Sequence, residues 1–243
     1  MSENLRYYGI MEKAFANEGM DFNKEMYGKY VKYMNMIREW NEKINLTAIT
    51  DEEEMIKKHF IDSIKCYRFG GFKGLGRILD VGTGAGLPGI PIKIADEGKS
   101  ITLLDSLNKR ILFLNEVIRE LQLKDIDTVH SRAEDLARKV EYREQFDGVV
   151  SRAVANMAVL SEFCLPYTKV GGYFIALKGP AVESEIEDAR NAVGMLGGRI
   201  EEVIPVEIEE TDLKHNIVVV RKTKNTPGIY PRKAGIITKK PIR

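Results

Sequence analysis

The sharpest chemical signal in the chain is a run of glycines directly after the apolar segment Ile78–Val81. This stretch, here called the glycine loop (82–88), contains Gly82, Gly84 and Gly86. Glycine lets the backbone turn tightly and bring a ligand against main-chain N–H groups, where a Cβ would collide. A dinucleotide fingerprint would need glycine at position 87, which is Leu87. The GxGxG spacing, with Asp80 just ahead, instead favours S-adenosylmethionine, which carries no pyrophosphate.

Two further acids follow the next two predicted strands. Asp105 stands 19 residues after Gly86, at a position where a carboxylate can accept hydrogen bonds from a ribose diol. Ala133 and Glu134 follow the third strand, at the edge of the sheet where an adenine would be held. Each acid alone could instead cap a helix, but together with the glycine loop they favour a cofactor site.

Cations also stand at the strand ends. Arg132, Arg152 and Lys178 follow the third, fourth and fifth predicted strands, and Lys109 and Arg110 follow the second. They predict a positively charged rim that binds RNA phosphates or fixes the carboxylate of methionine. The alternative is that they are ordinary surface charges.

The chemistry at the fourth strand differs from that of many DNA amino-methyltransferases. Those enzymes carry an Asn/Asp-Pro-Pro-aromatic motif at this position, whereas this chain has Ser151-Arg152-Ala153. The three histidines are scattered, and none stands beside a plausible serine or cysteine nucleophile. An acceptor with a free lone pair, such as N7 of guanine, needs no general base. We therefore expect catalysis by orientation and proximity.

The elements that would position these residues alternate regularly along the chain. This order predicts an α/β fold with a mainly parallel, Rossmann-like sheet and right-handed crossovers. The two last strands are close enough to pair as an antiparallel hairpin at the sheet edge. The predicted strands are Ile78–Val81, Ile101–Asp105, Asp127–His130, Phe146–Val150, Gly172–Leu177, Ile200–Ile208 and Asn216–Arg221, and the predicted helices between them are Pro88–Asp96, Asn108–Leu121, Ala133–Val140, Met157–Leu165 and Glu183–Leu196.

The residues ahead of the sheet are predicted to be helical. Between Phe22 and Ile44, apolar residues recur at helical period, which indicates core packing. Asn45-Leu46-Thr47 breaks the pattern, and Asp51 can cap the next helix. We expect an N-terminal helical region (1–73), a cofactor-binding domain (74–222) and a basic tail (223–243).

Charge is distributed unevenly over the 243 residues. The formal net charge is +1, but the stretch 221–243 holds eight basic and no acidic residues, which leaves −7 for the rest. A basic tail favours a polyanionic partner, and a frayed, solvated terminus is the alternative.

No stretch is long and apolar enough to span a membrane, and the N-terminal residues indicate a cytoplasmic protein. Cys66 and Cys164 stand alone and predict no metal site.

Taken together and in order, these segments resemble the ribosomal RNA small-subunit methyltransferase G family, also called glucose-inhibited division protein B. The resemblance runs from Trp40 to the carboxyl terminus. It rests on Trp40 to Thr47, His59 with Asp62-Ser63, Asp80 to Pro91, Leu104 to Arg110, Arg132-Ala133-Glu134, Ser151-Arg152-Ala153 and Ala176 to Gly179. The tail segment 230–235 resembles a basic extension of some members, which usually continue with a proline where this chain has Ile236-Ile237-Thr238.

The resemblance implies a class I S-adenosylmethionine-dependent methyltransferase fold and methylation of guanine N7 in 16S ribosomal RNA. It implies that Gly82, Leu87, Ala133, Glu134 and Arg152 contact the cofactor, to which we add Asp105 on its spacing. It implies that Arg132 and Lys178 are RNA-binding or active-site cations. We expect the substrate to be the small subunit or an assembly intermediate, and the protein to be a monomer.

Three other functions compete with this one. A small-molecule methyltransferase would not need the basic tail or the cationic rim. A nicotinamide-dependent dehydrogenase is disfavoured by Leu87. A non-catalytic RNA-binding assembly factor that keeps a cofactor fold is disfavoured because nothing in the glycine loop is damaged.

Overall fold

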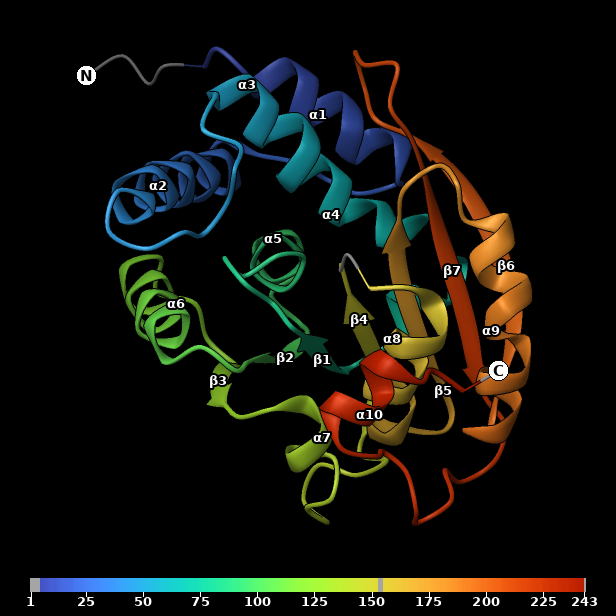
Figure 1. Cartoon of the computed structure of the whole chain (residues 1–243). Coiled ribbons are helices and arrows are strands. Elements are labelled where there is room, and N and C mark those ends of the chain that lie inside the picture. Colours follow the sequence, from blue (N-terminus) through green and yellow to red (C-terminus); the bar gives the residue numbers. More distant parts are fainter. Residues whose placement is uncertain (1–4, 153–154, 243) are drawn as a thin grey trace.

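One sheet organises the computed structural model, which describes residues 5–152 and 155–242 (Figure 1). Within these residues seven strands form the order β3-β2-β1-β4-β5-β7-β6. The first five are parallel, and β7 pairs antiparallel with both β5 and β6, as the sequence predicted. The strands are β1 (Arg77–Val81), β2 (Ser100–Asp105), β3 (Ile126–His130), β4 (Phe146–Ser151), β5 (Thr168–Lys178), β6 (Gly198–Glu207) and β7 (Lys214–Lys222).

Helices cover both faces of the sheet. Successive strand residues point to opposite faces, so Ile78 belongs to one buried cluster and Leu79 to the other. The first cluster contains α5 (Gly89–Ala95) and α6 (Asn108–Glu120). The second contains α7 (Ala133–Leu136), α8 (Met157–Cys164) and α9 (Glu183–Met195). The predicted helices are confirmed, except that α7 ends at Leu136 instead of Val140.

The N-terminal helices pack on the same face as α5 and α6 (Figure 1). They share one apolar cluster with that face, so the described part of the predicted helical region packs directly against the sheet unit. Asn23 and Asp51 cap α2 and α3, the latter as predicted. The segments are α1 (Tyr8–Asn17), α2 (Lys24–Asn41), α3 (Glu52–Met55), a π-helical stretch (Ile56–Ile61), α4 (Asp62–Ile64) and two short 3-10 turns (Lys65–Arg68 and Gly70–Gly74).

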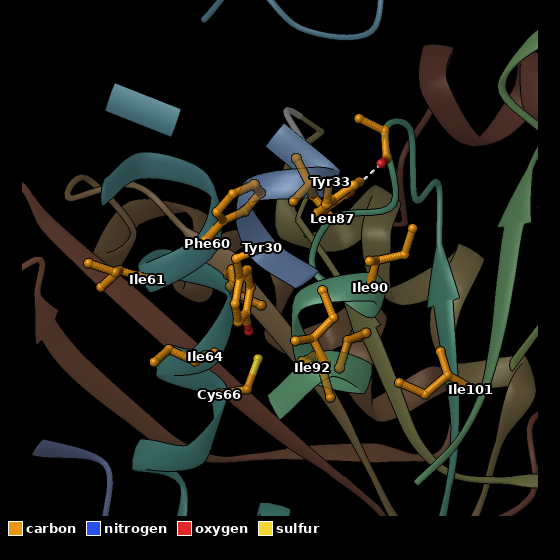
Figure 2. Close-up of a cluster of buried hydrophobic side chains, with 14 of the residues drawn as sticks. Tyr30, Tyr33, Phe60, Ile61, Ile64, Cys66, Leu87, Ile90, Ile92 and Ile101 are labelled. Atoms are coloured by element: carbon orange, nitrogen blue, oxygen red, sulfur yellow. Dashed lines mark hydrogen bonds between the residues drawn. The ribbon is translucent and has the colours of Figure 1, made fainter. Parts of the chain in front are cut away.

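Two tyrosines of α2 attach this helix to the sheet unit. Tyr30 Oη donates to the carbonyl of Pro91 at 2.7 Å, and Tyr33 Oη donates to the carbonyl of Ala85 in the glycine loop. Figure 2 shows both rings beside Phe60 and close to Leu87 and Ile90. The helical stripe is therefore core packing, as predicted, and it also supports the glycine loop from outside.

The carboxyl-terminal residues fold back on the sheet unit. A short helix, α10 (Ala234–Lys239), lies against α8, and the side chains of Tyr230 and Ile237 are buried (Figure 1). The alternative of a frayed terminus is therefore wrong for residues 223–242. Arg243, one of the eight basic residues, lies outside the described part of the chain, as does Ala153.

The remaining expectations about composition can be compared with the described residues. Cys66 and Cys164 are buried and unpaired, as expected of small apolar side chains. Burial raises the pKa of both thiols. In the same residues no cluster of metal-binding side chains occurs, and no helix has the length and apolar character to cross a membrane.

Gly86 allows a test of the contact between α2 and the glycine loop. Its φ is +97°, and an added Cβ would lie 2.5 Å from Ile90 Cδ1 and 2.8 Å from Tyr33 Oη. Gly84 has a φ of +60° but no atom closer than 4.0 Å. We expect Gly86→Ala to lower the free energy of unfolding by about 2–4 kcal/mol, and Gly84→Ala by about 1 kcal/mol.

Urea denaturation of the two variants and the wild type measures this difference. The matched substitution at Gly84 carries the backbone strain without the steric contact. Equal losses in the two variants would contradict the proposed role of Gly86 in making room for Tyr33.

Candidate active site

A cavity of ≈ 290 Å³ lies at the carboxyl edge of the parallel strands and is here called the glycine-loop cavity. Residues that follow β1, β2, β3 and β4 line it, among them Gly82, Asp105, Arg132, Ala133, Glu134 and Ser151. Ligands of open α/β sheets bind in this crevice. The structure therefore brings five of the eight predicted site residues to one cavity.

The glycine loop leaves room for a ligand in this cavity, whereas its N–H groups are used within the protein. Gly82 has a φ of +72°, and a Cβ built on it meets no atom within 4 Å. The amides of Gly82 and Thr83 donate to the carbonyl of Leu104 at 2.9 and 3.1 Å. The amide of Gly84 donates to Asp105 Oδ2 at 2.9 Å. Because these donors are already used, the loop suits a ligand without phosphates.

Asp80 lies beneath the loop and is fully buried. Its Oδ2 accepts hydrogen bonds from Thr83 Oγ1 at 2.6 Å and from the amide of Gly89 at 2.8 Å. Its Oδ1 is buried without a partner, and burial raises the pKa of this carboxyl to about 6. Asp80 thus fixes both ends of the loop from within, and it is absent from the residues that line the cavity.

Asp105 and Glu134 line the cavity, and neither caps a helix. The residue at the N-cap of α6 is Leu107, that at the N-cap of α7 is Arg132, and neither helix has a side-chain cap. The capping alternative is therefore wrong for both acids. Asp105 is 3% exposed and accepts from the amide of Leu107 at 2.9 Å, in addition to Gly84. A carboxylate has about four acceptor positions, so Asp105 keeps capacity for a ligand hydroxyl.

The opposite wall of the cavity is apolar. Leu104, Leu160 and Phe163 contribute to it, and Ala234 of α10 closes one side. A nucleoside needs both kinds of lining. Its flat base packs on apolar side chains, and its ribose hydroxyls donate to carboxylates. The residues present therefore fit S-adenosylmethionine.

The other predicted site residues lie elsewhere. Leu87 is buried in the apolar cluster beside α2, where its side chain packs with Tyr33 and Ile90 (Figure 2). Arg152 and Lys178 line a second cavity of ≈ 460 Å³, here called the arginine cavity, together with Lys58, His59, Asp62 and His215. The end of β4 contributes to both cavities, since Ser151 lines one and Arg152 the other.

Arg152 joins the N-terminal region to the sheet inside the arginine cavity. Its Nη1 donates to the carbonyl of Lys58 at 2.9 Å and to Asp62 Oδ2 at 3.3 Å. Its Nη2 donates to His59 Nδ1 at 3.3 Å. On the far side of Asp62, His215 Nδ1 donates to Oδ1 at 2.8 Å. A guanidinium only donates, so His59 faces it with an unprotonated nitrogen.

In this network His59 and Asp62 have a structural task, because they connect the N-terminal region to Arg152 of the sheet unit. Burial, with the nearby Arg152 charge, lowers the pKa of His59 to about 4. The hydrogen bond to Asp62 raises the pKa of His215. Sequence reasoning missed His215 because it stands 153 residues from its partner and no local motif marks it.

Lys178 is also held by protein groups. Its Nζ donates to the carbonyl of Ala155 at 2.9 Å and pairs with Glu185 at 2.7 Å. By contrast, the side chain of Arg132 is 68% exposed at the mouth of the glycine-loop cavity, 4.0 Å from Glu134. The two predicted active-site cations therefore occupy different cavities, and Arg132 is the more accessible to a large substrate.

Comparison with known proteins identifies the family. The cyclase SpnF, a solved structure, is 16% identical with a TM-score of 0.50, over 67% of this chain and 81% of that one. A family model, GidB, described as rRNA small subunit methyltransferase G, matches residues 26–216. The chain belongs to this family. The predicted resemblance and the class I methyltransferase fold are thereby confirmed.

Curated relatives of the GidB family cover the whole of this chain's length. Ribosomal RNA small subunit methyltransferase G of Clostridium tetani is 61% identical over 98% of this chain and 100% of its own. The protein of the same name from Clostridium perfringens strain SM101 is 58% identical over the same shares. The region matched by the GidB model contains the lining residues of the arginine cavity and those of the glycine-loop cavity except Ala234.

Gly82 allows a test of the cofactor placement in this GidB-family chain. We expect Gly82→Val to abolish binding of S-adenosylmethionine, because the new side chain would project into the glycine-loop cavity. The positive φ costs only about 1 kcal/mol, so the variant should stay folded. Calorimetric titration and circular dichroism measure the two properties. Wild-type affinity in a folded Gly82→Val protein would place the cofactor elsewhere.

His59 should make stability depend on pH. Its folded pKa of about 4 is below the ordinary 6.5, so between these values the unfolded chain binds a proton that the folded chain does not. Stability from this residue is therefore present above pH 6.5 and falls as the pH drops to 4, by up to about 3 kcal/mol. Urea denaturation at both pH values should show a smaller loss in His59→Gln than in the wild type.

The comparison must be made between variant and wild type at each pH. Asp80 acts in the opposite direction, because its folded pKa of about 6 lies above the usual value and favours the folded state at acid pH. Identical pH profiles for His59→Gln and the wild type would show that His59 is not held neutral by the network.

Proposed function

We propose that this protein transfers the methyl group of S-adenosylmethionine to N7 of one guanine in 16S ribosomal RNA. The observation that carries the proposal is the family match over residues 26–216, which includes Gly82, Asp105 and Glu134 of the glycine-loop cavity at the strand ends. Membership of the family makes the chain an S-adenosylmethionine-dependent ribosomal RNA methyltransferase, as the sequence predicted.

The residues of the glycine-loop cavity have separate tasks in holding the cofactor. Asp105 would accept hydrogen bonds from the ribose, and Ala133 and Glu134 would hold the adenine against Leu160 and Phe163. Gly82 leaves room for the amino-acid part. When bound, S-adenosylmethionine supplies an electrophilic methyl on its sulfonium. Leu87 would support this site from the core, because it packs behind the loop.

The guanine would approach from the arginine cavity, to which the neighbouring residue at the end of β4 contributes. The N7 atom has a free lone pair, so no proton has to be removed before it attacks. This agrees with the state of the nearby titratable groups, since His59, Asp62 and His215 already bind one another or Arg152. These residues would position the acceptor, and rate enhancement would come from alignment.

Cations at both cavities suit an RNA substrate. Arg132 would contact phosphate at the exposed mouth of the glycine-loop cavity, and Arg152 and Lys178 would fix the shape of the acceptor side. We propose a monomeric cytoplasmic enzyme that acts on the small subunit or an assembly intermediate. In this proposal the chain is divided into a helical region (1–73), a cofactor domain (74–222) and a basic tail (223–243).

Two of the alternative functions are disfavoured by specific contacts. A nicotinamide nucleotide needs amide donors for its pyrophosphate, and the loop amides of Gly82, Thr83 and Gly84 are already bonded. A non-catalytic assembly factor would not need the open space beside Gly82. A small-molecule methyltransferase would leave the exposed cations without a partner.

Methylation of RNA by the purified protein tests the function. Unmethylated 16S ribosomal RNA, free and in small subunits, is incubated with S-adenosylmethionine, and N7-methylguanosine is mapped by borohydride reduction and aniline cleavage. We expect one new cleavage position, and none with the Gly82→Val variant as the control. Methylation of free nucleosides but not of RNA would favour a small-molecule enzyme.

A further inference from the structure

The last described residues of the chain form a strap (223–242) that packs on the α8 side of the sheet unit and brings α10 beside the cofactor site. It begins after β7, at the sheet edge opposite the strand ends, where the amide of Lys224 donates to the carbonyl of Gly197 at 3.0 Å. It reaches the glycine-loop cavity with Ala234, the first residue of α10. The strap thus connects the two edges of the sheet.

The strongest attachment of the strap is the ion pair between Arg232 and Glu162 of α8. Glu162 is fully buried. Its Oε1 accepts from the amide of Arg232 at 2.8 Å and from Nε at 2.9 Å, and its Oε2 accepts from Nη2 at 2.6 Å. A bidentate pair with a buried carboxylate is both strong and directional. Loss of the arginine would leave a buried charge unpaired, which is costly.

Two arginines of the segment before β4 hold the backbone of the strap. Arg143 donates to the carbonyls of Thr226 at 2.8 Å and Tyr230 at 3.0 Å. Arg138 donates to the carbonyl of Pro231 at 2.6 Å. These bonds satisfy strap carbonyls that would otherwise lack intramolecular partners. The strap is therefore attached at several points along its length and is not a free tail.

The attached strap brings α10 to the edge of the cofactor site. Ala234 lines the glycine-loop cavity together with Arg132, and Ile237, one turn further, is fully buried. The contribution of Ala234 to the cavity consequently depends on the attachment of the strap. The cofactor site and the tail are parts of one structure.

The outer side of α10 is positively charged. Lys233, Lys239 and Lys240 are exposed, and in the described residues none of them makes an ion pair. The strap contains no acidic residue. A six-residue helix is about 9 Å long, so these lysines lie within the span of two or three consecutive phosphates. Arg132 adds a further exposed cation at the same cavity.

We propose that α10 is a shared wall, which closes the cofactor cavity with Ala234 and binds the RNA backbone with Lys233, Lys239 and Lys240. Arg232 and Glu162 are the positioning residues that keep it there. The choice of RNA as the polyanion rests on the proposed function. Because phosphate contacts carry no sequence information, this surface would set affinity and orientation, not the choice of guanine.

Three variants separate the two roles of α10. In the first, Lys233→Ala, Lys239→Ala and Lys240→Ala are combined, which should weaken binding to a 16S ribosomal RNA transcript and leave affinity for S-adenosylmethionine unchanged. Three lost phosphate contacts should make the slope of log affinity against log salt shallower by about 2. The loss should be the same on a random RNA of equal length.

The second variant, Arg232→Ala, should weaken binding of both S-adenosylmethionine and RNA, since the wall and its lysines lose their position. The third, Ala234→Leu, should weaken cofactor binding alone, because it narrows the cavity without touching the attachment. It also keeps the proposal testable if Arg232→Ala fails to fold. Lys224→Ala is the matched control, an exposed strap lysine at the opposite sheet edge.

Filter binding over a salt series and calorimetry measure the two affinities. The RNA-binding role would be overturned if the triple-lysine variant kept the wild-type salt slope. It would also be overturned if the slope changed no more per removed lysine than it does in Lys224→Ala. Full cofactor affinity in both Arg232→Ala and Ala234→Leu would overturn the shared wall. Failure of the wild type to methylate RNA would instead contradict the proposed function, since these binding measurements do not depend on methyl transfer.

Discussion

The buried carboxylate of Asp80 is the constraint on which the cofactor site depends. One of its oxygens binds both Thr83 and the amide of Gly89, so the glycine loop leaves β1 and enters α5 in a fixed shape. Tyr33 of α2 holds the same loop from the other side through the carbonyl of Ala85. The loop is therefore held between the sheet and an N-terminal helix, and its open side can only face the cavity. Gly86 allows this arrangement because it has no side chain to displace Tyr33.

A second polar network ties the N-terminal region to the acceptor side of the sheet. Arg152, at the end of β4, binds the carbonyl of Lys58 and the carboxylate of Asp62, and Asp62 also binds His215 of β7. Three elements distant in sequence are thus fixed around one guanidinium. Each titratable group in this network has a structural partner, which is consistent with a reaction in which no proton is removed from the nucleophile. In the proposed reaction, rate enhancement would come from the alignment of methyl donor and acceptor.

Local patterns in the sequence were sufficient to predict the sheet and the glycine-loop cavity. The succession of strands and helices, the strand ends and the position of Asp105 follow from period and spacing, so Gly82, Asp105, Arg132, Ala133 and Glu134 were placed together without coordinates. Long-range partners could not be derived in this way. The pairing of Arg152 with Asp62 spans 90 residues, and nothing in the neighbourhood of either residue specifies it.

The basic tail is a second case in which the sequence did not indicate a long-range partner. Its charge is visible in the sequence, but its attachment depends on Glu162, a residue of α8 that is 70 positions away. A buried acid on a helix that is otherwise apolar on its inner face is the one signal that could have indicated a basic partner. The N–H groups of the glycine loop were expected to face a ligand, whereas those of Gly82, Thr83 and Gly84 bind protein acceptors, because the loop closes back on β2.

The hydrogen bonds that those amides already make affect which adenosine-containing molecules the cavity favours inside a cell. Adenine nucleotides such as ATP share the adenosine part of S-adenosylmethionine and are abundant competitors for any adenosine pocket. A triphosphate in the glycine-loop cavity would find no free backbone donors at Gly82 to Gly84, because these amides already bind protein acceptors. S-adenosylmethionine carries no phosphate, so it does not need those donors. The hydrogen bonds of one loop therefore favour the methyl donor over an adenine nucleotide at this cavity.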